Sequence, residues 1–539
     1  MKFEDEVKQK IELIETRYYI TVVSVFVCGL LAHLYQFTNK NFNYDELGQT
    51  PAGFGAGISL GRWGLQLIGD MVGVFFRTYS IPMVNGMIAL IFIALSAVCI
   101  VKTFDISDKV CCFLIGGIIA TFPALVSTYF FMFTAPYYGF AMLLACVSGM
   151  LLTKGIDELW QSSEIERRSS IKKFVVNTLL GIASITLATG IYQSYCSVTL
   201  CIILLNVIMR LYEDGEDIKR TLIVGITYCV EFTISILLYL LGTKIAVKVT
   251  GIQLDDYRGM SDIGTINIGG LFTALKCVYK NYLLLMTPRD VYQINPIYIV
   301  NVIFVLVNCV CIFLIWNKIR SKSSIINKVF FIVMLVLFPV ATFFPEVLTQ
   351  GAGGVYSIMT YAVVFVFILP IIMYDKYRCG LTDTTRKDYA GRVLCISTFA
   401  CILVYIWFAN GNYQALQYTT YHDLAYFETL ATQVKSLDGY TADMPVAFVG
   451  DGFDDPTFMA GGLMDSYFDI EGKWPTNVNY FNNIYLWTSY LGYTPEIIEF
   501  KDSEYLLEVE KIKEMPSYPE SGSIAIVDGK VIIKGCVKQ

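Results

Sequence analysis

Two adjacent carboxylates, Asp45 and Glu46, are the residues of this sequence whose type and position best suit chemistry. They follow the first long apolar run, in a loop of residues 41–47 at the expected membrane surface. A carboxylate there could act as a general base that accepts the proton of a hydroxyl group. Arg62, which follows a glycine-rich stretch, is a natural partner for a departing phosphate because its guanidinium binds pairs of oxygen atoms. The alternative is that both acids belong to a solvated loop.

Further polar and aromatic side chains are expected on the same side of the membrane. The cations that could assist with a phosphate are Arg258, Lys244 and Lys248. Contact with lipid headgroups is the alternative for each cation, because long basic side chains reach toward the interface. The residues expected to line a substrate cavity are Tyr44, Trp63, Tyr192, Gln193 and Glu346. Interfacial tyrosines also serve as anchors, and Glu346 could lie in a solvated loop.

The elements that must position these residues are membrane helices. The chain has 539 residues, of which 55% are hydrophobic and 16% charged, with a mean hydropathy of +0.56. Soluble proteins carry about 25% charged residues, so this composition indicates a polytopic membrane protein. Runs of about 18 or more apolar residues can cross a bilayer. About eleven are predicted, at roughly 18–38, 83–103, 110–130, 135–153, 174–191, 195–213, 221–246, 296–316, 329–344, 355–374 and 393–410.

The distribution of basic residues predicts the orientation of these spans. The loops around 102–109, 154–173 and 376–392 are rich in Lys and Arg, whereas the short loops 128–136 and 191–195 contain neither. Basic loops tend to stay in the cytoplasm. We therefore expect a cytoplasmic N-terminus, with the loop that carries the two acids on the outer side.

Two outer segments within the membrane part are too long to be simple connectors. The first outer loop, 39–82, contains an amphipathic stretch from Ser59 to Arg77. The second outer loop, 247–295, contains another from Leu271 to Leu285. Amphipathic helices of this kind lie in the plane of the membrane interface, so both loops are expected to hold interfacial helices.

A third outer segment, residues 411–539, marks a change in composition because hydropathy falls and charges return. Val446–Val449 is a predicted strand, and Asp528-Gly529 is a tight-turn signal between two apolar runs. We therefore predict a mainly α chain with two domains. Residues 1–410 form a transmembrane helical bundle, and 411–539 a small soluble α/β domain outside the cytoplasm.

Several classes of function and site are disfavoured. A net charge of −6 does not suit a nucleic-acid partner. None of the 15 cysteines forms a Cys-X-X-Cys pair, so neither zinc nor a disulfide framework is indicated. We expect no metal and no other cofactor, although Asp255-Asp256 could bind a divalent cation or a sugar. His33 and His422 are the only histidines, which disfavours a membrane acyltransferase with a histidine in its core.

The first outer loop resembles a known family. Tyr44-Asp45-Glu46-Leu47, followed by residues 59–64 (Ser-Leu-Gly-Arg-Trp-Gly), is similar to the GtrII-type glucosyltransferases, which modify bacterial surface polysaccharides such as the O-antigen. Tyr192-Gln193 and the Tyr-Gln-Ala of 413–415 fit the same resemblance. It covers most of the membrane part and weakens in the tail. It implies a GT-C-like fold in a bacterial cytoplasmic membrane.

The resemblance also implies a reaction. An acid of the first outer loop would act as base, and a hexose, expected to be glucose, would leave a polyprenyl phosphate by one inverting displacement. This chain has Asp-Glu where many relatives have two aspartates, so either acid could be the base; Asp45 is favoured. The acceptor would be a surface polysaccharide or lipid-linked glycan. Implied partners are the bilayer, a small flippase and a donor synthase at the cytoplasmic face.

Two other readings stay open from the sequence. A flippase or other transporter of lipid-linked glycans would have a similar number of helices, and Glu231, within the span 221–246, is the residue that best suits transport. The large loops on one side favour the enzyme, because transporters more often show two related halves. A polysaccharide polymerase is the third reading, and the acid-rich first loop argues against it.

Overall fold

The computed structural model describes residues 15–48, 57–76, 80–161, 167–213, 218–256, 267–286, 325–352, 355–379, 389–450, 485–498 and 503–536, with residues 299, 301–307, 309, 310 and 313. Contacts divide the chain into two compact units. The helical unit comprises Met1–Thr38, Phe54–Arg77 and Ile81–Asn410. The C-terminal unit comprises Asn39–Gly53, Thr78–Ser80 and Gly411–Gln539. The predicted first outer loop, 39–82, thus contributes to both units.

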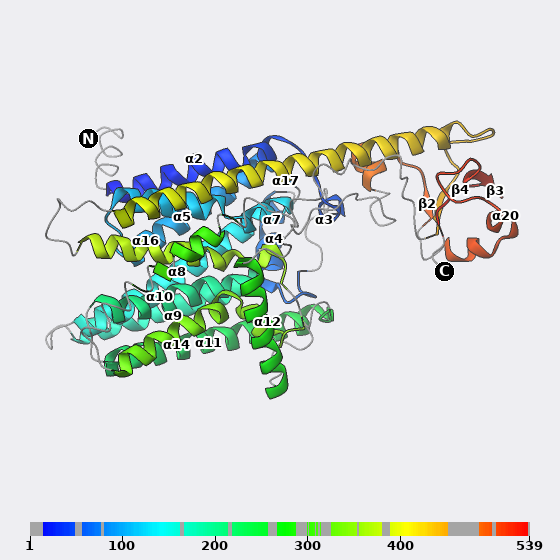
Figure 1. Cartoon of the computed structure of the whole chain (residues 1–539). Coiled ribbons are helices and arrows are strands. Elements are labelled where there is room, and N and C mark those ends of the chain that lie inside the picture. The colour runs from blue at the N-terminus through cyan, green and yellow to red at the C-terminus, as the bar shows by residue number, and fades with distance from the viewer. Residues whose placement is uncertain are drawn as a thin grey trace, which may run out of the picture. The chain divides into compact units, whose positions relative to one another are not determined.

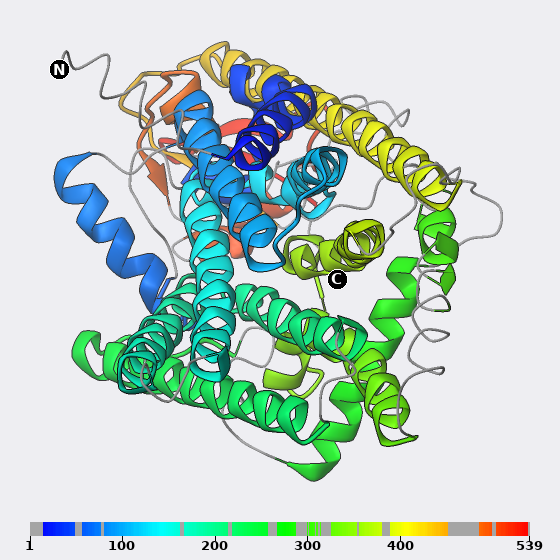
Figure 2. The same ribbon diagram turned by 90° about the vertical axis from the view of Figure 1, so that its left-hand side faces the viewer.

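The helical unit is built from long apolar helices, which Figure 1 shows running largely side by side. Figure 2 views most of them nearly end-on. The longer helices are α2 (Thr16–Thr38), α4 (Trp63–Phe75), α5 (Pro82–Thr103), α6 (Lys109–Thr121), α8 (Ala135–Gln161), α9 (Arg167–Ile191), α10 (Cys196–Glu213), α11 (Ile218–Thr250), α12 (Ile268–Met286), α14 (Ile325–Thr342), α16 (Val364–Cys379) and the first part of α17 (Tyr389–Lys435). Short elements join them: α7 (Ala124–Phe130), α15 (Phe344–Leu348), η1 (Gln193–Tyr195), η3 (Ser357–Met359) and η4 (Tyr361–Val363).

Within the described residues, eight helices are long and apolar enough to cross a membrane, so the chain is a multi-pass membrane protein. They correspond to eight of the predicted spans, in α2, α5, α8, α9, α10, α11, α14 and α17. A ninth, predicted at 110–130, is the bent pair α6 and α7. The run 355–374 instead begins with two short 3-10 helices, η3 and η4, before α16; of the 21 residues of the run 296–316, eleven are described, all of them helical.

The bend between α6 and α7 has a local cause in the sequence. The two helices meet at 45°. Pro123 lacks a backbone N–H and disfavours helical geometry at the residue before it. Phe122 accordingly leaves the helix with φ −55° and ψ 134°. A hydropathy window, which averages over this point, cannot detect such a break.

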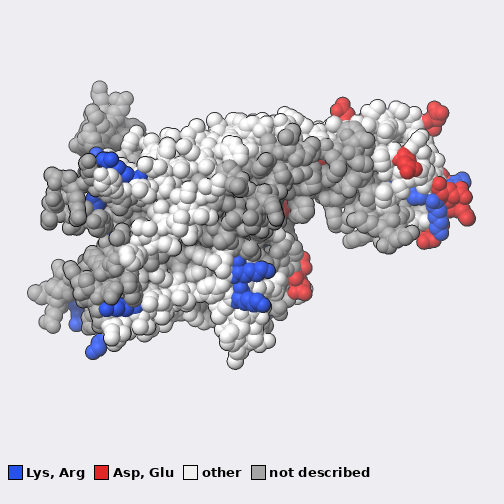
Figure 3. Space-filling view, in the orientation of Figure 1, with Lys and Arg blue, Asp and Glu red and all other residues white. Residues whose placement is uncertain are grey.

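Charge is distributed unevenly over the helical unit. Figure 3 shows Lys and Arg gathered at one end of its helices, a broad uncharged surface along their middle, and a further basic group on α12. The spans also carry exposed apolar side chains, among them Leu179 on α9 and Leu237 and Leu241 on α11, each more than half exposed. A wide uncharged band with charge at its edges is the surface that a bilayer requires.

The C-terminal unit combines the second part of α17 with a small mixed sheet. Its strands are β1 (Val446–Val449), β2 (Ile497–Ile498), β3 (Ile524–Val527) and β4 (Lys530–Lys534), in the order β2-β1-β4-β3. Strand β1 pairs in parallel with β2 and β4, while β3 and β4 pair antiparallel. Three short helical segments complete the described part: η6 (Leu486–Tyr490), η7 (Glu504–Glu508) and α20 (Glu510–Lys513).

Two sequence predictions in this unit are confirmed. The strand Val446–Val449 is β1, fully buried at the centre of the sheet. Asp528-Gly529 is the turn of the hairpin between β3 and β4, with φ 47° and 75°. Positive φ at both residues is the geometry that a two-residue turn needs to match the strand twist. Around β1, a hydrophobic core forms with Trp487 and the α17 residues Tyr426, Phe427 and Leu430.

Candidate active site

The two acids of the first outer loop lie on the short helix α3 (Tyr44–Gly48) in opposite environments. Asp45 is exposed, whereas the Glu46 side chain is fully buried. Successive residues of a helix point about 100° apart, so the two acids face different directions from α3. The side-chain oxygen of Asn43 accepts a hydrogen bond from the Glu46 backbone N–H at 3.0 Å and so supports the start of the helix. Asp45 is the more accessible acid.

Lys40 forms an ion pair with the buried Glu46. Its ammonium nitrogen lies 3.5 Å from Glu46 Oε1 and donates a hydrogen bond of 3.2 Å to the Ser80 carbonyl. A buried carboxylate is costly unless a cation or donors accompany it. The sequence interpretation missed Lys40, although a basic residue six positions before the buried acid was the available signal. The pair anchors α3 and thereby the neighbouring Asp45.

The segment before α3 is held along α17 by contacts within the C-terminal unit. Gln417 donates a hydrogen bond of 3.2 Å to the side chain of Asn39, and the Phe42 backbone N–H donates a longer one of 3.5 Å to the Thr420 hydroxyl. Phe42 and Leu47 are fully buried in the core around β1. The loop that carries Asp45 is therefore an integral part of this unit.

In the helical unit, Arg62 stands at the start of α4 with its guanidinium stacked on Tyr192. The guanidinium carbon lies 4.8 Å from the centroid of the Tyr192 ring. That ring is itself buried and packs against Tyr138, with 4.7 Å between ring centroids. A cation held over an aromatic face is attracted to the negative charge of the ring. The structure thus brings together two predicted site residues from distant parts of the sequence.

Hydrogen bonds fix the backbone turn immediately before Arg62. The Gln193 side chain donates to the Leu60 carbonyl at 2.8 Å and to the Tyr239 hydroxyl at 3.1 Å. The Tyr239 hydroxyl in turn donates to the Gly61 carbonyl at 3.3 Å. Gly61 has φ 68°, a conformation that side chains with a Cβ rarely adopt. Sequence reasoning identified Gln193 but missed Tyr239, which lies inside an apolar span.

Trp63 packs against backbone that only glycine leaves accessible. A Cβ atom on Gly190 would lie 2.7 Å from its ring, and one on Gly242 would lie 2.9 Å away. A Cβ on Gly64 would lie 2.8 Å from the carbonyl carbon of Gly190. The start of α4 therefore fits closely onto α9 and α11. Trp63 belongs with Arg62, Tyr192 and Gln193 in one cluster, which we call the arginine cluster.

The remaining cations lie apart from this close packing or outside the described residues. Lys244 and Lys248 are both exposed on α11. Arg258 and the side chain of Tyr44 fall outside the part that the structure describes. The second outer loop does meet the first, because the Asp255 backbone N–H donates a hydrogen bond of 2.9 Å to the Ser59 carbonyl.

Glu346 is buried in a separate setting. It lies on α15, and one of its carboxylate oxygens accepts a hydrogen bond of 3.2 Å from the Asn281 side chain of α12. Helix α15 packs against both α12 and η1. A solvated loop, the alternative considered from the sequence, does not describe this residue. Sequence reasoning did not identify Asn281, which looks like one polar residue of an amphipathic helix.

The described residues contain no group of three or more His, Cys, Asp or Glu side chains that could hold a metal ion. The adjacent acids Asp255 and Asp256 are both exposed. Three protein ligands are a common minimum for a catalytic metal. Each unit instead offers a different polar group: the C-terminal unit an exposed carboxylate, suited to proton transfer, and the helical unit a guanidinium stacked on a tyrosine, suited to binding a phosphate.

Comparisons with known proteins add a family but no individual relative. No curated protein and no solved structure matches the chain. The model of one protein family, Glucosyl transferase GtrII, matches residues 34–367, which is more than half of the 539 residues. The match includes the acid pair, the arginine cluster and Glu346. The chain belongs to this family of glucosyl transferases and is therefore a membrane glycosyltransferase.

Proposed function

We propose that this enzyme transfers a hexose, with glucose as the first candidate, from a polyprenyl phosphate to a surface polysaccharide or a lipid-linked glycan. Family membership supports glycosyl transfer. A set of apolar helices able to cross a membrane suits an enzyme with a lipid-linked donor. The roles of the two acids are assigned from their difference in exposure. Asp45 is exposed, while Glu46 is buried beside Lys40. Asp45 is the proposed base, and Glu46 is proposed to position it.

The proposed reaction is a single displacement. Asp45 accepts the proton of an acceptor hydroxyl, whose oxygen attacks the anomeric carbon of the donor. The bond between that carbon and the phosphate oxygen breaks, and the phosphate leaves with the electron pair. One displacement at one carbon inverts its configuration. A carboxylate suits the first step because it can accept the proton as the oxygen becomes nucleophilic.

Arg62 is the proposed binding residue for the donor phosphate. A guanidinium can bind two phosphate oxygens at once, provided that its plane is fixed. The Tyr192 ring beneath it supports such a fixed plane. Gln193 and Trp63 are proposed to act through Arg62, since they secure the turn that precedes it and the helix that follows it. Supporting roles remain for the other predicted residues: Lys244, Lys248 and Arg258 near the phosphate, and Tyr44 and Glu346 in the substrate cavity.

The reaction is proposed to take place at the outer face of a bacterial cytoplasmic membrane, with the N-terminus in the cytoplasm and the C-terminal unit outside. The concentration of Lys and Arg in one set of loops supports this orientation. A donor made at the cytoplasmic face would then need a synthase there and a flippase to deliver it. The reaction as written needs no metal or organic cofactor, since a carboxylate and a guanidinium supply its charges.

The test is a sugar-composition and linkage analysis of surface polysaccharide from cells carrying the intact gene, a deletion or Asp45→Asn. Asp255→Asn is the matched control because it makes the same substitution at another exposed aspartate, on the second outer loop. We expect one side-branch hexose to disappear in the deletion and in Asp45→Asn but not in Asp255→Asn. Normal branching in Asp45→Asn, with the protein present in the membrane, would remove the base role.

The same analysis separates the competing functions. A carrier of lipid-linked glycans would affect export of the whole polymer, and a polymerase would affect its length. Family membership favours the branch-adding transferase. Glu231, the residue that best suited transport, is buried and accepts a hydrogen bond of 2.8 Å from Thr178 of the neighbouring helix α9. That contact gives it a role in joining two helices.

A further inference from the structure

Helix α12 differs from the membrane spans in both composition and direction. Its 19 residues, Ile268–Met286, give it the length of a span, yet it is not among the eight helices apolar enough to cross a membrane. Figures 1 and 2 show it running across the direction of the neighbouring spans. A helix transverse to spans that cross a bilayer runs parallel to the bilayer surface.

One face of α12 is fixed to the helical unit. Ala274 and Val278 are fully buried. The Tyr279 hydroxyl donates a hydrogen bond of 2.6 Å to the Val336 carbonyl of α14, and Asn281 donates to Glu346 of α15. Ala274, Val278 and Asn281 share one face of the helix, and Tyr279 reaches α14 from beside that face. These contacts determine which residues α12 presents on the opposite side.

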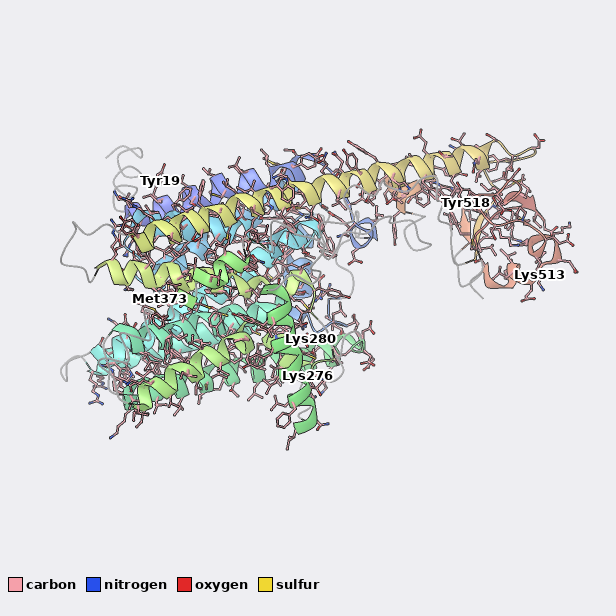
Figure 4. All side chains as sticks on the ribbon, in the orientation of Figure 1. Tyr19, Lys276, Lys280, Met373, Lys513 and Tyr518 are labelled. Carbon is pink, nitrogen blue, oxygen red and sulfur yellow. The ribbon has the colours of Figure 1, made fainter. Side chains whose placement is uncertain are left out.

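The opposite face presents two lysines among apolar side chains. Lys276 and Lys280 are exposed and one helical turn apart, and Figure 4 shows them next to each other on α12. They form the basic group on α12 in Figure 3. Within the described residues, neither lysine takes part in an ion pair of 4.0 Å or less. The exposed apolar residues on the same helix are Ile268, Leu271, Phe272 and Leu283.

We propose that α12 lies flat in the membrane interface and that Lys276 and Lys280 bind the phosphate of an anionic bilayer phospholipid. The ammonium groups match the headgroup phosphate in charge, and the exposed Phe272 and Leu283 match the acyl chains. Surface lysines interact with lipid phosphate as point charges, so this site discriminates by headgroup charge. The inference requires only a multi-pass membrane protein and does not depend on the proposed reaction.

A bulk lipid fits this surface better than the sugar donor. Reacting phosphates need donors that converge in a site shielded from water. Lys276 and Lys280 instead are both exposed and project from one face of a single helix. Each lysine near an anionic surface adds about 1 kcal/mol of attraction, which corresponds to roughly fivefold in binding. Loss of both charges should therefore reduce retention of the anionic lipid by roughly 10- to 30-fold.

The experiment compares lipid retention by the purified full-length chain. Native mass spectrometry would count bound phosphatidylglycerol and phosphatidylcholine for the wild type, Lys276→Gln/Lys280→Gln and Lys276→Arg/Lys280→Arg. The control is Lys511→Gln/Lys513→Gln, which removes two exposed lysines from α20, outside the helical unit. We expect preferential retention of phosphatidylglycerol in the wild type, the arginine variant and the α20 control, with loss in the α12 glutamine variant alone.

Two results would overturn the proposal. One is equal retention of the two lipids, or unchanged retention of phosphatidylglycerol in the α12 glutamine variant. The other is displacement of the bound lipid by an equimolar amount of a polyprenyl phosphate, which would make the lysines a donor site. Misfolding of the glutamine variant would not obscure the outcome, because the arginine variant and a thermal melt report on folding separately.

Discussion

The ion pair between Lys40 and Glu46 allows the roles of Asp45 and Glu46 to be distinguished by the stability of variants as well as by their activity. Glu46→Gln removes a buried charge but keeps the shape of the side chain, and Lys40→Met removes its partner. If Glu46 only positions Asp45, Glu46→Gln should retain transfer activity at moderate temperature. The two single variants should nevertheless differ in stability, because one leaves a solvated cation and the other leaves a buried anion.

The expected magnitudes follow from the geometry of the pair. Two unit charges 3.5 Å apart attract each other by about 5 kcal/mol at an effective dielectric constant of about 20. Dehydration of Glu46 and the water that still reaches Lys40, with 34% of its side chain exposed, offset much of that attraction. We expect Glu46→Gln to lower the free energy of unfolding by about 2 kcal/mol. Lys40→Met leaves the Glu46 carboxylate buried after loss of this cation and should cost about 3–5 kcal/mol.

The assay is thermal unfolding of the full-length chain in detergent, alongside a transfer assay. A unit of this size loses about 2–4 °C of melting temperature per kcal/mol, so we expect losses of roughly 5 °C for Glu46→Gln and roughly 10 °C for Lys40→Met. The double variant should melt near Glu46→Gln, since no charge stays buried. Two results would refute the reasoning: Glu46→Gln melting below Lys40→Met, or a folded Glu46→Gln protein that has lost transfer.

Three further predictions concern the helical unit. Tyr192→Phe keeps the ring under the guanidinium and should preserve donor binding, whereas Tyr192→Leu should raise the KM for the donor severalfold, measured by steady-state kinetics. Gly190→Ala places a Cβ 2.7 Å from the Trp63 ring and should destabilise the protein by about 1–3 kcal/mol. Gly225→Ala, whose Cβ would meet a single atom at 3.9 Å, should melt like the wild type. Glu231→Gln can still accept the threonine hydrogen bond and should melt near the wild type, while Glu231→Leu should lose about 1 kcal/mol of stability through the unpaired hydroxyl.

The sequence predicted the membrane helices well because hydropathy is a property of each segment alone. Eight predicted runs coincide with helices of suitable length and composition. The sequence could not predict that 355–363 would contain two short 3-10 helices, since those residues are as apolar as a helix and their shape depends on packing. The bend at Pro123 was readable from the proline, but its angle depends on how the neighbouring helices pack.

The candidate site was less predictable because its contacts join distant parts of the chain. The pattern Asp45-Glu46 identified two acids without showing which would be buried, since that depends on the face that α3 turns toward α17. Arg62 and Tyr192 were each singled out from the sequence, but their stacking requires α4 and η1 to be neighbours. Lys40 and Tyr239 were missed, because a lysine beside a span and a tyrosine inside one have common structural explanations.

The turn before Arg62 has a consequence for how the protein is made. Its carbonyls at Ser59, Leu60 and Gly61 accept hydrogen bonds from Asp255, Gln193 and Tyr239. The arginine leaves the ribosome early, whereas its supports are synthesised only with η1, α11 and the loop that follows. A nascent chain halted before α11 would thus display Arg62 in a turn lacking two of these three supports. Completion of this turn is therefore coupled to synthesis of the chain through Asp255, and a truncation before α11 would lose two of the three supports while it keeps the first spans.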